Sequence, residues 1–579
     1  MKKIVSILLA CTALLACTRK SAIELEPAQT GVAVRQVKIN RTVAMPYLSS
    51  TYQLIDWYAL ARNYDAFAFN HNAQGEYQPL IWIDHSSTFN VNQDCFGLYT
   101  TIGDYRTPER NPMGHESINT IAAVLGGGLV GIDKTNQNGY NYVKMLQNYY
   151  ARLTGWGIML NGTSGYARDW WYNVLPNVLY WGVCDVFPRV EGADDIQKSI
   201  ADKFAEADKV MGSNYAWSYF DYKQMKGYKT NIPAQQDAAG GHGYVLLNAW
   251  RKFGDPAYLE AAKSAIETLD RQGESRLYEI LLPFGAYAAA VLNASQGTNY
   301  NVLKMLDWSF DGCKSNSGRK GWAVTAGTWG PYDISGLQGS ITDGGGYAFL
   351  MNSLEYPWPV VPIVKYQPQF AASIGFWMYH LASACRLFYP YYIDDEHKYA
   401  PELKQHTGGV VGYEGLRYSD RYGTFKGVCP IAEGDGPSWN SENGTITMYS
   451  LYSSSPVGIL GSLVSKTDVE GVTRVDCNVT DFYAERPFPV NLYYNPYTET
   501  KTVTYDCKHL TYGDLKYEGG EYDLFDIVSK DYLAKGCSGN CKITLQGRSS
   551  AVLVELPAGT KLYQDGSRIV DSQRRVISW

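Results

Sequence analysis

The feature that most constrains the fold of this 579-residue chain is a change in its hydrophobic period. Between about residues 47 and 392, apolar residues recur every three to four positions, as they do on one face of an α-helix, and no strand-like alternation interrupts them. After about residue 413, the pattern changes to alternation and short β-branched runs separated by turns. The sequence therefore predicts an α+β multidomain protein in which a helical part precedes an antiparallel β part.

The first part is expected to form helices joined by loops of uneven length. Pro256 and Pro283 each suit the first turn of a helix, where the missing N–H is harmless. Because no fixed sequence period marks a solenoid, a ring of helical hairpins, an α/α toroid, fits best, with a site formed by loops at one mouth. The expected helices are Tyr52–Ala66, His115–Leu129, Tyr140–Ile158, Ala167–Val186, Ile196–Met211, Gly243–Phe253, Pro256–Arg271, Pro283–Ala294, Asn301–Phe310 and Gln369–Phe388.

The second part is expected to form an antiparallel β-sandwich that packs on the toroid. We place the toroid at residues 45–412 and the sandwich at residues 413–579. The expected strands are Thr445–Leu451, Val457–Ser465, Thr473–Tyr483, Asn491–Tyr494, Lys501–Asp506, Lys542–Leu545 and Ala551–Glu555.

The N-terminus has the pattern of a processing signal. A basic start is followed by an apolar run, Ile4–Leu15, that is too short to span a bilayer. The ending Leu14-Leu15-Ala16-Cys17 resembles the lipobox of bacterial lipoproteins, which implies cleavage after residue 16 and acylation of Cys17. Residues 1–16 are then a signal peptide and residues 17–44 a polar tether; an ordinary secretory signal is the alternative. We expect a protein anchored in the cell envelope that touches the membrane only through its lipid.

Composition narrows the class of partner. The formal charge of −6 comes without a basic stripe, which argues against nucleic acid. The 47 Tyr and 15 Trp residues suit stacking on sugar faces, although they also serve cores and interfaces. The His and Cys residues show no spacing typical of a zinc site, and we expect neither a metal nor another cofactor. An oligo- or polysaccharide is the expected substrate, and a homo-oligomer is left open.

The stretch Gly321–Leu350 is too rich in Gly for a helix and combines aromatic rings with carboxylates. Rings supply flat faces for a sugar, and carboxylates supply hydrogen bonds or proton transfer. The alternative is a set of tight turns that plugs the core. The candidate site residues in this stretch are Trp322, Trp329, Tyr332, Asp333 and Asp343.

Glu279 lies within the apolar run Leu277–Pro283, just upstream of an expected helix start. Apolar neighbours disfavour the charged form of a carboxyl, which suits a general acid. The alternative is a structural ion pair with Arg276. Hydrolysis of a glycosidic bond usually takes two carboxyl groups, and we pair Glu279 as acid with Asp333 as base or nucleophile. Asp343 is the substitute for Asp333.

Two helix openings supply further candidates. Arg168, Asp169, Trp170 and Trp171 open one helix; Asp169 is either a site residue or an N-cap, and at least one Trp is expected in the cleft.

His242 and Tyr244 follow a Gly pair at another helix opening, where His242 polarises a substrate or merely caps the helix. Arg168 and Arg319 favour a uronate, because Arg binds carboxylates bidentately. The alternative for Arg319 is a solvated turn.

A lipoprotein with an α/α toroid followed by a β-sandwich resembles the secreted carbohydrate-active enzymes of glycan-foraging Gram-negative bacteria. It is similar to toroidal glycoside hydrolases acting on uronic acids, with the family 154 β-glucuronidases as the nearest type. The Asp169-Trp-Trp opening also resembles the Asn-Trp-Trp opening of toroidal polysaccharide lyases, with Asp in place of Asn. The resemblance implies an exo-β-glucuronidase-like hydrolase. A lyase using β-elimination, a non-catalytic glycan-binding lipoprotein and a structural lipoprotein remain alternatives.

Overall fold

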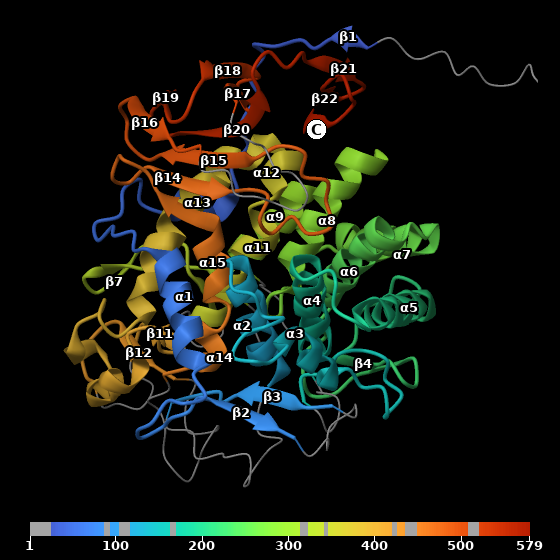
Figure 1. Ribbon diagram of the computed structural model, residues 1–579, viewed down its shortest axis with the longest axis vertical. Coiled ribbons are helices and arrows are strands. Elements are labelled where there is room, and N and C mark those ends of the chain that lie inside the picture. Colours follow the sequence, from blue (N-terminus) through green and yellow to red (C-terminus); the bar gives the residue numbers. More distant parts are fainter. Residues whose placement is uncertain are drawn as a thin grey trace, which may run out of the picture.

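The computed structural model contains a helical body with antiparallel strands at one end (Figure 1). It describes residues 25–85, 93–102, 116–162, 169–312, 322–340, 346–419, 425–434, 449–507 and 520–579.

The helical body is a closed ring of helices. Around the ring, each helix contacts the next in the order α2, α4, α6, α8, α11, α15 and again α2. Helices α1, α5, α7 and α9 pack on the outside of this ring, which is the arrangement of an α/α toroid. The ring helices are α2 (Ser117–Leu129), α4 (Trp170–Val186), α6 (Ala238–Phe253), α8 (Leu281–Gln296), α11 (Pro357–Val360) and α15 (Val457–Leu463). The other helices are α1 (Trp57–Ala68), α3 (Tyr142–Met145), α5 (Ala193–Met211), α7 (Pro256–Arg271), α9 (Val302–Asp311), α10 (Leu350–Glu355), α12 (Ile363–Tyr366), α13 (Ala371–Ala384) and α14 (Leu451–Ser454).

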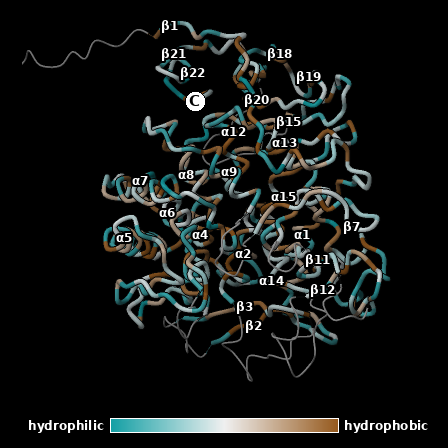
Figure 2. Tube along the Cα trace, turned by 180° about the vertical axis from the view of Figure 1, so that it is seen from behind, coloured by the Kyte–Doolittle hydropathy of each residue, from teal (hydrophilic) through white to brown (hydrophobic). Residues whose placement is uncertain are grey.

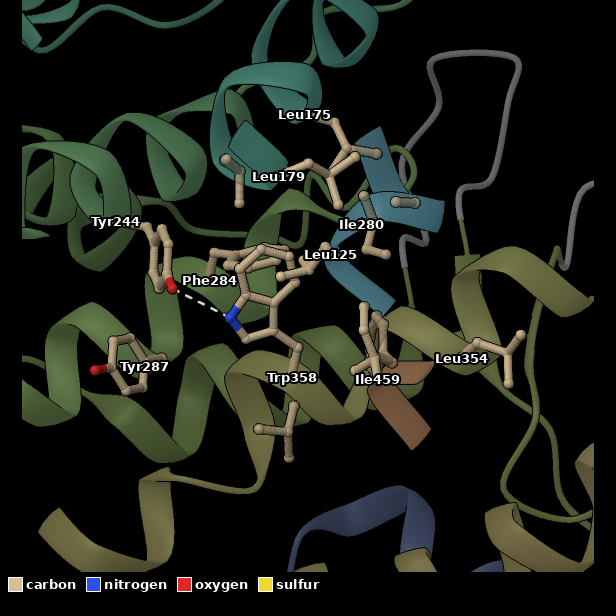
Figure 3. Close-up of a cluster of buried hydrophobic side chains, with 14 of the residues drawn as sticks. Leu125, Leu175, Leu179, Tyr244, Ile280, Phe284, Tyr287, Leu354, Trp358 and Ile459 are labelled. Atoms are coloured by element: carbon tan, nitrogen blue, oxygen red, sulfur yellow. Dashed lines mark hydrogen bonds between the residues drawn. The ribbon is translucent and has the colours of Figure 1, made fainter. Parts of the chain in front are cut away.

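The centre of the ring is filled by the side chain of Trp358 (Figure 3). Its indole Nε1 donates to the hydroxyl of Tyr244 at 3.1 Å, and its ring meets that of Phe284 edge-on at 5.2 Å. Residues from all five other ring helices, among them Leu125 and Ile459, surround it. The toroid is therefore a packed core, as the chain's many apolar helix faces require, and a site has room only at its ends.

A five-stranded antiparallel sheet flanks the ring, with the order β12-β11-β10-β9-β6. The sequence analysis did not find it, because strands of three residues are too short to show alternation. Three of its strands come from the Gly-rich stretch that follows residue 321. Its strands are β6 (Trp322–Val324), β9 (Gln338–Ser340), β10 (Tyr347–Phe349), β11 (Gly415–Arg417) and β12 (Ile431–Glu433). Hairpins β2 (Ile81–Asp84) with β3 (Cys95–Leu98), β4 (Tyr219–Asp221) with β5 (Lys226–Tyr228), and β7 (Thr328–Trp329) with β8 (Tyr332–Asp333) complete this part.

The β part is a sandwich, as expected. A six-stranded antiparallel sheet, β13-β14-β15-β20-β17-β18, is covered on one face by the pair β16-β19 and on the other by α13. A small sheet, β1-β21-β22-β23, lies at the C-terminal end. The strands are β13 (Val464–Lys466), β14 (Thr473–Asp476), β15 (Val490–Asn495), β16 (Lys501–Tyr505), β17 (Tyr522–Asp526), β18 (Asp531–Cys537), β19 (Cys541–Leu545), β20 (Ser549–Pro557), β1 (Glu26–Pro27), β21 (Tyr563–Asp565), β22 (Arg568–Val570) and β23 (Val576–Ser578).

Two segments differ from the sequence-based expectation. Val457–Ser465 was expected as a strand, but most of it is helix α15, because a short apolar run is buried in either form and its periodicity cannot distinguish them. Gly458 lets α15 approach α2 closely: a Cβ there would lie 2.1 Å from the carbonyl oxygen of Gly126. The expected helix Tyr140–Ile158 ends as a 3-10 turn at Tyr149, because the backbone becomes extended at Tyr150; Gly155 and Gly157 beyond it adopt positive φ.

The packing partners also change later than residue 413. Strands β11 and β12 join the sheet beside the ring, and α15 contacts α1 and α2, so the sandwich begins with β13 at Val464. At the other end of the chain, part of the expected tether is docked on the fold. Strand β1 pairs with β21, and the backbone N–H of Val34 donates to the carbonyl of Val528.

Ring and sandwich meet at a buried ionic cluster around Asp481. Its carboxylate accepts from Lys365 Nζ at 2.6 Å and from the hydroxyls of Tyr287 and Tyr366 at 2.5 and 2.9 Å. Burial opposes ionisation, but Lys365 and Arg251 outweigh it and lower the pKa of Asp481. Viewed from behind, hydrophobic stretches run along the central helices and hydrophilic stretches occupy many outer loops (Figure 2). In the described part of the chain, no helix is both long and apolar enough to cross a membrane.

Candidate active site

An acidic residue stands directly before each of four ring helices in the described structure. Glu116, Asp169 and Asp237 hold the N-cap positions of α2, α4 and α6, and Glu279 precedes the N-cap of α8. Helix N-termini carry partial positive charge and favour anions. The three N-cap side chains do not bond to the amides of their own helices. Their side chains therefore contact other groups at this end of the ring. We call this end, with Glu116, Asp169, Asp237 and Glu279, the acidic mouth.

Asp169 and Asp237 both bind the segment that leads into α8. One oxygen of Asp169 accepts from the hydroxyl of Tyr278 at 3.0 Å and from Gln235 Nε2 at 2.8 Å. Asp237 Oδ2 accepts from the backbone N–H of Tyr278 at 3.0 Å. Burial raises the pKa of Asp237 to about 7, against the opposing effect of backbone N–H donors that include those of Tyr278 and Glu279. These contacts fix the backbone on which Glu279 is carried.

Glu279 lies on that fixed segment and is 4% exposed. Its neighbour is Asn352 of α10, whose amide nitrogen lies 3.4 Å from the Glu279 carbonyl oxygen and 3.5 Å from Oε2. The structural alternative of an ion pair with Arg276 is not what the structure shows, because Arg276 pairs with Glu274. Helix α8 begins at Leu281, so Glu279 lies just upstream of the helix, as the sequence predicted.

Two tyrosines share the field of these carboxylates. Tyr172 in α4 and Tyr452 in α14 are hydrogen-bonded to each other through their hydroxyls. Burial, followed by the charges of Glu116, Glu279 and Asp169, raises the pKa of Tyr172 well above its ordinary value. Burial, together with charges that include those of Glu116 and Glu279, also raises the pKa of Tyr452 well above its ordinary value. The charges of Glu116 and Glu279 thus act on both tyrosines, and that of Asp169 acts on Tyr172.

The flanking sheet supplies an aromatic wall beside Tyr452. On one face of the sheet, Trp322 of β6 lies 5.5 Å from Phe349 and 6.1 Å from Tyr347 of β10, measured between ring centroids. Phe349 in turn lies 6.4 Å from Tyr452. Arg417 of β11 stands over the ring of Tyr347 at 4.2 Å and forms a buried ion pair with Glu433. The mouth therefore joins acidic groups to flat aromatic faces.

Four of the predicted site residues belong to this mouth. Glu279 and Asp169 are among its carboxylates, the ring of Trp171 lies tilted against that of Tyr172 with centroids 3.9 Å apart, and Trp322 belongs to the wall. Arg168, Arg319 and Asp343, together with Cys17, lie outside the described residues.

Asp333 lies in a different environment from Glu279. Its carboxylate lies 3.3 Å from His380 Nδ1 of α13 and accepts from the backbone N–H of Ser335 at 2.9 Å; its own N–H donates to Thr51. Burial opposes ionisation, but the contacts with His380 and Ser335 lower the pKa of Asp333. A lowered pKa favours the ionised carboxylate, which the role of base or nucleophile expected for Asp333 requires. None of these contacts involves a residue of the acidic mouth. They therefore do not bring the carboxylate of Asp333 to that of Glu279.

The remaining predicted residues face other parts of the fold. His242 stacks on Phe204 of the outer helix α5 and bonds to the Tyr222 hydroxyl at 2.7 Å; burial lowers its pKa to about 3. Trp170 donates to the same hydroxyl at 2.8 Å. Tyr244 holds Trp358 at the ring centre.

Two others lie in the hairpin formed by β7 and β8. Trp329 meets Tyr418 edge-on, and the Tyr332 hydroxyl donates to Asp394 at 2.8 Å.

The sequence analysis did not assign Glu116, Tyr172, Asp237, Asn352 or Tyr452 to the site. Glu116 and Asp237 had one sequence signal, because each is an acidic residue immediately before an apolar ring helix. Tyr452 and Asn352 had no such signal, since they are placed by short helices in the later part of the chain.

No protein-family model matches the chain, and no curated protein matches it either. Among solved structures, a protein described as a glycoside hydrolase is 11% identical over 80% of this chain and 76% of its own, with a TM-score of 0.34. A GH127 β-L-arabinofuranosidase from Geobacillus stearothermophilus T6 is 11% identical over 91% and 83%, with a TM-score of 0.33. Another GH127 β-arabinofuranosidase is 10% identical over 95% and 84%, with a TM-score of 0.35.

These TM-scores are too low to carry an argument about this chain. Two of the three named proteins belong to family 127, and the third is named only as a glycoside hydrolase.

Proposed function

We propose that this protein is a glycoside hydrolase whose catalytic groups lie at the acidic mouth. The observation that carries the proposal is the grouping of Glu116, Asp169 and Glu279 around Tyr172, beside an aromatic wall. Glycosidase chemistry needs one carboxyl group to protonate the leaving oxygen and a second to act as base or nucleophile. Aromatic faces beside such a pair suit the apolar face of a sugar ring.

Within this group, Glu279 is the best candidate for the general acid. Its side chain is almost fully buried, and burial disfavours a charged carboxyl. Asp169 is the candidate base or nucleophile, because donors from Gln235 and Tyr278 orient one of its oxygens as an acceptor. Asp169 takes the role first given to Asp333, which packs against α13.

The same electrostatics disfavours the lyase alternative. β-Elimination requires a group that abstracts a carbon-bound proton, and a tyrosinate is the base that this mouth would offer. Burial, and after it the surrounding carboxylates, raises the pKa of Tyr172, so its anion is costly at neutral pH. A glycan-binding protein without catalysis would not need several acids gathered at one buried point.

For the substrate we propose a uronate-bearing glycan cleaved from its end, as by a β-glucuronidase. Arg417 at the aromatic wall supports this choice, although its ion pair with Glu433 offsets part of its charge. In the sequence, Arg168 directly precedes Asp169. Arg binds carboxylates through two parallel N–H donors.

The test is a glycan panel with paired uronides and neutral glycosides, read by product mass spectra. A hydrolase adds water to its product, whereas a lyase leaves an unsaturated sugar. We expect hydrolysis, with the uronide preferred over its neutral counterpart. Unsaturated products would overturn the hydrolase, and equal rates on both members of each pair would overturn the uronate alone.

We also propose that Cys17 is acylated and anchors the protein in the cell envelope. The support is the sequence ending Leu14-Leu15-Ala16-Cys17. Cys17→Ala is expected to release soluble protein or leave an unprocessed precursor, detected by fractionation and intact mass. Unchanged fractionation and mass would contradict the anchor.

A further inference from the structure

A cavity of about 480 Å³ lies at the end of the ring opposite the acidic mouth, between the ends of α6 and α8 and the C-terminal strands (Figure 1). Trp250 and Lys365 belong to the ring side of its wall, Val554 to the sandwich, and Arg568 and Trp579 to the C-terminal segment. The volume falls in the range of small-molecule sites, which often occur where two domains meet. No step of the proposed reaction uses it.

The wall of this cavity is strongly cationic. It carries one acidic side chain, Glu485, and five basic ones: Arg251, Lys365, Arg486, Arg568 and Arg574. The carboxylates that pair with these cations are not part of the wall. They are Asp481 with Lys365 at 2.6 Å, Asp185 with Arg486 at 3.0 Å, and Asp565 with Arg568 at 2.6 Å and with Arg574 at 3.8 Å.

The carboxylates behind the wall orient the cations, and the surface that faces the cavity remains positively charged. In a partly enclosed, low-dielectric space such a field favours an anion. Guanidinium groups in particular match the planar geometry of a carboxylate.

Aromatic side chains complete the wall. The rings of Tyr366 and Trp579 lie 5.7 Å apart, and the guanidinium of Arg568 stands 5.9 Å from the Trp579 ring. Trp250 and Tyr483 are further members of the wall. A ligand that fits must offer both a flat apolar face and an anionic group. A saccharide with a carboxylate has both features.

We propose that this cavity is a second, non-catalytic site that binds a carboxylated saccharide. It lies at the other end of the ring from Glu279, so it can hold one acidic residue of a glycan while the acidic mouth acts on another chain or another part of the same chain. The proposal does not depend on which reaction the mouth performs.

The test is calorimetric titration with cellobiouronic acid and with cellobiose, which differ by one carboxylate. The full chain with Glu279→Gln is used as the background, so that the probe is not consumed. Arg568→Gln and Trp250→Ala remove a charge and a ring from the cavity, and Arg152→Gln removes a matched charge from an exposed position elsewhere.

We expect the acid to bind at least tenfold more weakly to both cavity variants, with no change for Arg152→Gln. Cellobiose should bind the cavity at least tenfold more weakly than the acid. The Tm of each variant shows that the fold is intact, and Trp250→Ala leaves the Asp565 ion pair in place if Arg568→Gln unfolds. Unchanged isotherms in folded cavity variants, or equal binding of cellobiose, would overturn the proposal.

Discussion

Acidic residues stand before inner and outer helices of the same ring, and they do different work. Before the outer helices, Asp56 of α1 and Asp255 of α7 accept hydrogen bonds from amides of their own helices, as N-caps do. Before the ring helices, Glu116, Asp169 and Asp237 hold the same position without capping. Acidic residues at the same helix position therefore stabilise the outer helices by capping them, whereas those before the ring helices form the acidic mouth.

The physical reason is the direction that each helix start faces. An outer helix begins at the solvent-facing rim, where its own amides are the best donors within reach. A ring helix begins beside its neighbours, so its acid meets side chains and loop amides of the next helix. Asp169 illustrates this with Tyr278, and Asp237 with the amide of the same residue.

The largest difference between the two groups should appear in catalysis. Glu279→Gln and Asp169→Asn, made separately, are expected to lower kcat by about 10²–10⁴-fold, because each removes a proton-transfer or nucleophilic group. The measurement is kcat on the best substrate of the panel, with Tm as a check on folding. Glu274→Gln, on the same loop but paired with Arg276, is the matched control and should retain activity. Near-normal turnover in either variant refutes the role given to that residue.

The second difference concerns pH. Asp237 has a folded pKa of about 7 against an ordinary value of 3.8, so between these pH values the folded state keeps a proton that the unfolded state loses. Its contribution to the free energy of unfolding should therefore fall as pH rises through this window, by up to a few kcal/mol. Asp237→Asn should flatten that part of the pH–stability profile, measured by denaturant unfolding. A profile that keeps its slope in the variant counts against the raised pKa.

The capping acids should show the reverse pattern. Asp255→Ala is expected to lower the free energy of unfolding by about 0.5–2 kcal/mol, because the amide of Ala257 loses its acceptor. Activity per folded molecule should not change. Thermal or denaturant unfolding measures the first effect and kcat the second. A loss of kcat without a loss of stability would break the distinction between outer and ring helices.

The smallest effect is expected at the aromatic wall. Trp322→Ala should raise KM about threefold to tenfold, because one stacking face is worth about 0.5–1.5 kcal/mol, with a smaller change in kcat. Trp329→Ala is the control, since Trp329 packs against Tyr418 away from Phe349. An equal change in KM for the two variants would show that Trp322 has no special role in binding.

The carboxylate pair shows where sequence reasoning stopped. Glu279 could be found because an acid inside an apolar run is unusual wherever it folds. Asp333 was chosen by a different criterion, as a carboxylate within a Gly-rich, aromatic stretch, and its carboxylate lies against His380 of α13. The Gly-rich stretch was correctly singled out, yet its contribution is a sheet face, and the strands that build it are too short for a sequence pattern.

By itself the sequence determined the order of helical and β parts, the start of α8 beside Glu279 and the burial of its aromatic helix faces, because hydrophobic period and proline position are local properties. Only the tertiary structure decided that α15 closes the ring, with Gly458 packed against Gly126, and that the charges of Glu116, Asp169 and Glu279 act on Tyr172. Those outcomes depend on contacts between residues hundreds of positions apart, and such contacts are selected by the packing of the whole core, which no local pattern records.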